Sequence, residues 1–130
     1  MPANERSEAA EPLPLLSIII PTLNEEAALP ALLADLGRQR GIKLEVLIGD
    51  GGSTDGTAEI AKSFGVRFVA TKRGRGAQMN AAARLATGDY LFFLHADSRL
   101  DDPDLLARGL ACLRQAEQEQ PWVAGHFRLR

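Results

Sequence analysis

Apolar residues along the chain occur in two patterns, which are short runs and helical stripes. Mostly apolar runs occupy residues 15–20, 44–48, 66–70 and 90–94. Short runs rich in β-branched residues are typical of strands buried on both faces, so we expect four strands there, with Pro21 ending the first. The terminal stretch "WVAGHFRLR" alternates apolar with polar residues, which predicts a fifth strand with one solvated face.

Helical stripes fill the gaps between these runs. Leu29, Leu32, Leu33 and Leu36 recur at the spacing of one helical face. By the same reasoning, the expected helices cover residues 29–38, 58–64, 77–86 and 102–118. Asp102 is expected to cap the last helix, with Pro103 at its first position, and Cys112 is expected to face the core.

Strands and helices therefore alternate along the chain. This alternation predicts an α/β fold, Rossmann-like and three-layered, with a mostly parallel sheet covered by helices on both sides. At 130 residues and 45% apolar content, the chain is the size of one soluble domain. Residues 1–13 are acidic and contain prolines, so we expect a disordered leader there and a single domain over residues 14–130.

Charge and composition narrow the range of partners. The 15 Lys and Arg residues nearly balance the 17 Asp and Glu residues, which gives no general electrostatic reason to bind nucleic acid. With a single cysteine, the chain can form no internal disulfide, which fits a reducing compartment, and we expect a cytoplasmic protein. No apolar stretch reaches the roughly 18 residues of a membrane-spanning helix, whereas peripheral membrane contact stays open.

Polar residues gather in three loops that each follow a strand. These loops are "PTLNEE", "GDGGSTDGT" and "HADS". In a parallel sheet such loops leave at the same edge, where ligands bind. Lys72, Arg73 and Arg75 precede the helix over 77–86, and a basic helix start suits an anion such as a diphosphate. A divalent cation on Asp97 would reconcile these basic residues with the carboxylates by bridging to phosphate.

Each of these residues also has a purely structural interpretation. Asp50 can belong to a turn, Asp97 can cap the next segment, and His95 can be a loop hydrogen-bonder. Exposed arginines near loops are common. Asn80 lies within an alanine-rich helix where its propensity is poor, which mildly favours a functional role.

Three segments together resemble a known family. "SIIIPTLNEE", "EVLIGDGGSTDGT" and "GRGAQMNAAARLATGDYLFFLHADS" are similar to the successive motifs of family 2 glycosyltransferases, which have the GT-A fold. The resemblance covers nearly all of residues 17–98 and extends to a subgroup of small bacterial enzymes with "DGGSTDGT" and "HAD". It implies transfer of a sugar, with inversion, from a nucleotide-diphosphate donor to an acceptor that the sequence does not identify.

The resemblance also assigns site residues. It implies nucleotide contacts by Pro21, Thr22, Asn24 and Glu25 in the first loop, a nucleobase contact near Asp50, contacts to ribose and phosphates by Arg75 and Asn80, and a metal motif at His95, Ala96 and Asp97. The last Asp of this Asp-x-Asp-like motif is the metal ligand, so Asp97, with His95 beside it, is expected to hold Mn²⁺ or Mg²⁺.

The sequence departs from the family pattern at two positions. Gly51 stands where family members usually have a second carboxylate, which leaves the base contact open. His95 replaces the first Asp of the metal motif, and a neutral imidazole ligates Mn²⁺ better than Mg²⁺. The family's general base and acceptor-binding half follow the strand at which this chain stops, so we expect the donor-binding half only.

Two other functions remain open from the sequence. A nucleotidyltransferase also combines a doubly wound sheet with carboxylates and metal, although it would carry a glycine-rich basic loop where this chain has "PTLNEE". A non-catalytic nucleotide-binding module is the other. The unpaired strand near Arg130 also leaves self-association open.

Overall fold

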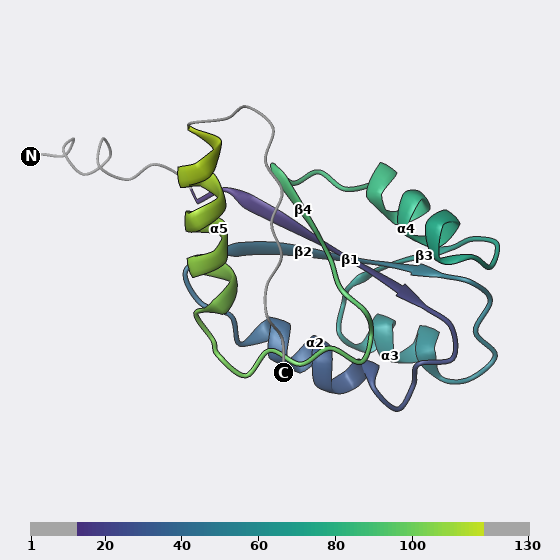
Figure 1. The fold of residues 1–130 in the computed structure, drawn as a ribbon. Coiled ribbons are helices and arrows are strands. Elements are labelled where there is room, and N and C mark those ends of the chain that lie inside the picture. Colours follow the sequence, from purple (N-terminus) through teal and green to yellow (C-terminus); the bar gives the residue numbers. More distant parts are fainter. Residues whose placement is uncertain (1–12, 119–130) are drawn as a thin grey trace, which may run out of the picture.

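The computed structural model describes residues 13–118. Strands and helices alternate as the sequence predicts (Figure 1). The strands are β1 (Leu15–Thr22), β2 (Lys43–Asp50), β3 (Arg67–Ala70) and β4 (Tyr90–Phe93), and the helices are α2 (Leu29–Gly37), α3 (Thr57–Ser63), α4 (Arg75–Arg84) and α5 (Leu105–Glu117). The expected fifth strand, the leader up to residue 12 and the terminus near Arg130 lie outside the described residues.

The four strands form one parallel sheet in the order β3-β2-β1-β4. Strand β1 is central, and the side chains of Ile18, Ile19 and Ile20 on it are fully buried. The chain runs outward from β1 through β2 to β3 and then crosses back to place β4 on the other side. The strand order therefore reverses between β1 and β4, and this is where a parallel α/β sheet binds ligands at its carboxyl edge.

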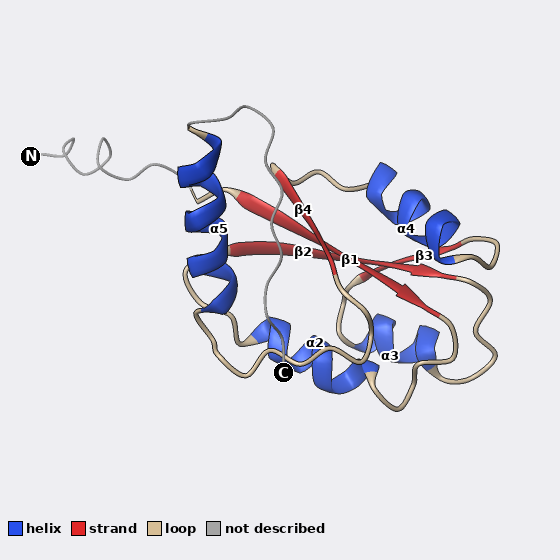
Figure 2. Cartoon of the chain, viewed as in Figure 1, coloured by secondary structure: helices blue, strands red, loops and turns tan. Residues whose placement is uncertain are grey.

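Helices cover both faces of the sheet, which confirms the three-layer expectation (Figure 2). The larger core packs residues of α2, α3 and α5 against one face of β1 and β2, with Ile18 and Ile20 at its centre. The smaller core lies under α4, where Ala82 packs on Ile19 and Leu47. Among the described residues, no helix is long and apolar enough to cross a membrane.

Strand β1 runs past the point at which the sequence led us to end it. Pro21 pairs in register with Gly49, and the strand continues to Thr22. Alternate residues of a strand direct their amides to opposite neighbours, and Ile19 O accepts a hydrogen bond from Leu94 N on the β4 side. Pro21 therefore directs its missing N–H to the same side, beyond the last β4 partner, where no ladder bond is lost.

Three details near the helices differ from expectation. Helix α4 begins at Arg75, because Gly74 adopts φ 139° and Gln78 N donates to Gly74 O at 2.8 Å. Asp102 does not cap α5, which begins at Leu105. Its carboxylate instead accepts from Asp104 N at 2.8 Å and forms a turn before the helix. Cys112 is exposed, because the buried stripe of α5 runs through Leu106 and Leu110.

Candidate functional site

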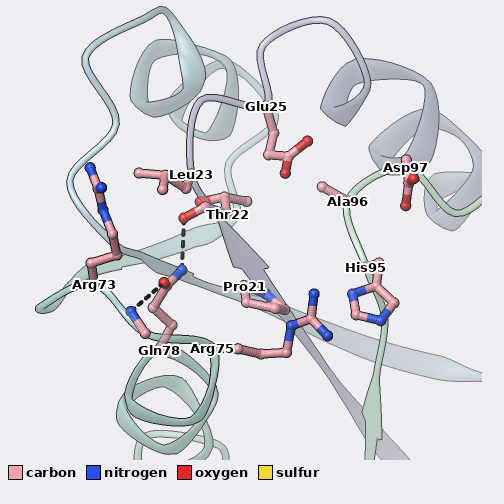
Figure 3. A pocket seen from close by; sticks show the side chains of 11 residues that line it. Pro21, Thr22, Leu23, Glu25, Arg73, Arg75, Gln78, His95, Ala96 and Asp97 are labelled. Carbon is pink, nitrogen blue, oxygen red and sulfur yellow. Dashed lines mark hydrogen bonds between the residues drawn. The ribbon is translucent and has the colours of Figure 1, made fainter.

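A cavity of about 520 Å³ opens at the carboxyl edge, beside the ends of β1 and β4 (Figure 3). Its lining comes from the three segments that the sequence singled out, together with the start of α4. The lining residues are Pro21, Thr22, Leu23, Glu25, Arg73, Gly74, Arg75, Gln78, His95, Ala96 and Asp97. Segments far apart in the sequence thus meet at the place where the strand order reverses.

The loops after β1 and β2 are joined by a series of hydrogen bonds. Asn24 N donates to Ser53 Oγ at 2.7 Å, and Asn24 Oδ1 accepts from Thr54 N at 2.8 Å. Glu25 N donates to Thr57 Oγ1 at 2.9 Å. Asn24 itself has φ 55°, a conformation that asparagine tolerates better than most residues. Asn24 is exposed and does not line the cavity, so its side chain serves the loop rather than the site.

Asp50 is buried, and its carboxylate is fully engaged by the protein. Its Oδ1 accepts from Thr22 Oγ1 at 2.6 Å and from Ser53 Oγ, while Oδ2 accepts from the backbone N–H groups of Gly52 and Ser53 at 3.0 and 2.8 Å. Burial raises the pKa of Asp50, but the hydrogen bonds outweigh burial and hold it below its ordinary value. Asp50 lies outside the cavity lining, so the carboxylate expected near the nucleobase instead orders the loop.

An Asp50→Asn variant is expected to lose about 1–3 kcal/mol of the free energy of unfolding at pH 7, because its amide NH₂ would face N–H donors. The folded pKa of Asp50 lies below the ordinary 3.8, so its carboxylate stabilises the fold above pH 3.8 and loses this effect as the pH falls further. Urea unfolding at pH 7, 4.5 and 3.5 should therefore give a gap from wild type that is constant at the first two values and smaller at the third. A gap that grew at pH 3.5 would contradict this account.

Gln78 is a site residue that the sequence analysis missed. Its side chain is buried, with Nε2 donating to Thr22 O at 2.8 Å and Gly49 O at 3.0 Å, and Oε1 accepting from Gly74 N at 3.0 Å. It therefore ties the start of α4 to the ends of β1 and β2. The available signal was its position four residues before Ala82, on the buried stripe of an alanine-rich helix.

The two cavity arginines point in different directions. Arg75, in the first turn of α4, extends across the cavity toward His95, whereas Arg73 lies on the opposite side near Leu23 (Figure 3). Asn80 is exposed and lies outside the lining, because it is about 200° around α4 from the buried Gln78. The structure therefore brings Arg75, but not Asn80, to the cavity.

The loop after β4 presents His95 and Asp97 to the cavity. Ala96 is buried between them, so the flanking side chains are both exposed and both line the cavity. Leu94 N donates to Ile19 O at 3.0 Å, which fixes one end of the loop. The other end is fixed by Asp35 of α2, whose buried carboxylate accepts from Leu100 N and Arg99 Nε, each at 2.8 Å.

Negative charge accumulates on this side of the cavity. Burial raises the pKa of the half-buried Glu25, and the nearby carboxylates of Asp97 and Asp55 raise it further, while His95 has a smaller opposite effect. A divalent cation would relieve this repulsion. In the part of the chain that the structure describes, no three His, Cys, Asp or Glu side chains come together as a complete metal site.

The residues nevertheless fit a metal that is shared with a ligand. Mg²⁺ and Mn²⁺ are commonly held by one or two protein side chains, with phosphate oxygens and water completing the coordination. Asp97 offers an exposed carboxylate and His95 an imidazole, and the Arg75 guanidinium extends toward the same place. This donor set suits a cation that arrives with a diphosphate.

Comparison with known proteins defines the class. The fold is the GT-A fold of glycosyltransferases, as in S. aureus TarS solved with UDP-GlcNAc (26% identity, TM-score 0.68, covering 77% of this chain and 31% of TarS). A mannosyltransferase from Pyrobaculum calidifontis, PcManGT, solved with GDP-Man and Mn²⁺, is similar (28% identity, TM-score 0.68, 76% of this chain and 32% of PcManGT).

The glycosyl transferase family 2 model matches residues 17–119, and the chain belongs to that family. A PGL/p-HBAD biosynthesis glycosyltransferase of Mycobacterium tuberculosis is 44% identical over 111 residues, which cover 80% of this chain. The same alignment covers 43% of that relative, so this chain spans less than half of its length. An uncharacterized glycosyltransferase of Haemophilus influenzae is 38% identical over 64% of this chain and 29% of its own length.

Proposed function

We propose that this chain forms the donor-binding part of a glycosyltransferase that transfers a sugar from a nucleotide diphosphate, with inversion, to an acceptor. The observation that carries the proposal is a single cavity in which Arg75, at the start of α4, stands across from His95 and Asp97. Family membership favours this function over a nucleotidyltransferase. TarS and PcManGT were solved with UDP-GlcNAc and with GDP-Man plus Mn²⁺, which supports the same class of donor here.

The protein's own groups would act on the diphosphate from two sides. The first-turn N–H groups of α4 lack preceding carbonyl partners and, with the Arg75 guanidinium, would bind its oxygens. Asp97, with His95 beside it, would hold Mn²⁺ in preference to Mg²⁺ because an imidazole suits the former. When bound, the cation would supply charge neutralisation for the departing diphosphate. Cytoplasmic location and self-association stay predictions.

Calorimetric titration of the chain with UDP-, GDP- and TDP-sugars, with and without Mn²⁺, tests the proposal. At least one donor should bind, and Mn²⁺ should strengthen that binding by about tenfold or more, since even residues that only orient metal ligands change metal affinity by about that factor. Asp97→Ala should abolish the Mn²⁺ effect.

Asp101→Ala is the matched control, because Asp101 lies in the same loop, is exposed and does not line the cavity. It should bind donors as wild type does. Donor binding that is indifferent to both Mn²⁺ and Asp97→Ala would remove the metal role. No binding by any donor would remove the proposed function. Sugar transfer or donor hydrolysis by the chain would in turn argue against a non-catalytic binding module.

A further inference from the structure

The wall of the cavity near Gly51 has no room for a side chain. A Cβ added to Gly51 would lie 2.6 Å from Gln78 Oε1 and 3.2 Å from the Arg73 Cα. Gln78 cannot move aside cheaply, because its buried amide makes three hydrogen bonds that join β1, β2 and α4. As long as Gln78 keeps this position, no carboxylate can project from residue 51.

The same wall offers no other free carboxylate. Asp50 is engaged by Thr22, Gly52 and Ser53, and the Gln78 oxygen is taken by Gly74 N. Glu25 and Asp97, the two carboxylates that line the cavity, are drawn on its far side with His95 (Figure 3). The charged group that remains on this wall is the Arg73 guanidinium, which is exposed and has no hydrogen bond or ion pair with any described residue.

We propose that the wall formed by Leu23, Gly51 and Arg73 binds the nucleobase of the donor and reads only its hydrogen-bond acceptors, through the Arg73 guanidinium. This assignment rests on the proposed function, which puts the diphosphate between Arg75 and Asp97. The base is the part of a nucleoside diphosphate farthest from that group, so it would occupy the opposite end of the cavity. Leu23 supplies an apolar side chain for the face of the ring.

A wall without a carboxylate has a consequence for base selectivity. Uracil carries an N–H donor at ring position 3, whereas cytosine carries an acceptor there, so a carboxylate at this place would pair with uracil and repel cytosine. Arg73 is a donor only, and both bases present the ring oxygen at position 2. UDP and CDP should therefore bind with affinities within about fivefold of each other, which is roughly the effect of one ordinary hydrogen bond.

Calorimetry with UDP, CDP and inorganic pyrophosphate, each with Mn²⁺, tests the assignment. Arg73→Ala should weaken UDP and CDP by about fivefold or more and leave pyrophosphate unchanged, because the base contact is lost and the phosphate contacts remain. Arg84→Ala is the matched control, since Arg84 is an exposed arginine in the last turn of α4, away from the cavity, and it should bind all three as wild type does.

A preference for UDP over CDP beyond about fivefold would overturn the assignment. So would an Arg73→Ala variant that binds both nucleotides normally, or one that loses pyrophosphate as strongly as the nucleotides, because Arg73 would then contact phosphate. These outcomes leave the proposed function standing, since nucleotide binding itself is retained in wild type. If wild type bound neither nucleotide nor pyrophosphate, the proposed function would fail, and the base assignment with it.

Discussion

A Gly49→Ala variant is expected to lose about 3 kcal/mol or more of the free energy of unfolding, the upper range for overpacking a core. The added Cβ would lie 2.1 Å from the carbonyl oxygen of Gln78 and 2.8 Å from its carbonyl carbon. Both atoms belong to the backbone of α4, so no side-chain rotation can relieve the contact. Helix α4 would have to move away from the sheet, which would break the Gln78 hydrogen bonds as well.

Urea unfolding followed by circular dichroism measures this loss. Gly37→Ala is the matched control, because Gly37 is the last residue of α2, has nothing within 4 Å of its added Cβ and is not among the glycines with positive φ. Removing that glycine should be neutral or slightly stabilising. Equal stabilities of the two variants would show that α4 packs less closely on β2 than the structure indicates.

An Asp35→Ala variant is expected to lose about 2–4 kcal/mol, since it leaves buried donors without their acceptor. Asp35 is 1% exposed and binds Arg99 Nε and Leu100 N. The hydrogen bond from Arg99 is the main reason that the pKa of Asp35 lies below its ordinary value. Because Leu100 follows Asp97 closely, the variant should also weaken Mn²⁺-dependent donor binding.

Asp104→Ala provides the comparison for Asp35. Asp104 also pairs with an arginine, Arg40, at 2.9 Å, but the two side chains are 46% and 67% exposed. Exposed pairs contribute little, so the loss should stay below about 1 kcal/mol. Similar urea midpoints for the Asp35 and Asp104 variants would mean that the buried carboxylate does not anchor the loop.

The sequence predicted the order of elements well because the evidence for each is local. The leucine stripe of α2 and the apolar run of β1 identify their elements from neighbouring residues alone. Boundaries were less accurate where one backbone conformation or one missing partner decides. Helix α4 starts early because of the φ of Gly74, and β1 continues through Pro21 because β4 ends first.

The site was predicted in part for a comparable reason. A sequence shows which polar residues reach the carboxyl edge, so Glu25, Arg75, His95 and Asp97 were identified, and all four line the cavity. It does not show which of them the protein uses internally. Asp50 and Asn24 were expected to touch the nucleotide, yet their polar groups bind the neighbouring loop, and this depends on distances between segments about 30 residues apart.

The buried amide of Gln78 has a consequence for how such an enzyme can diversify. Residues that hold the frame, among them Gln78 and Asp50, point inward and tolerate little exchange, whereas Leu23, Arg73 and His95 are not tied into that frame. Donor preference can therefore drift through substitutions at the outer group without a loss of folding. A laboratory search for altered sugar-nucleotide choice should vary those outer positions together and leave the inner ones untouched.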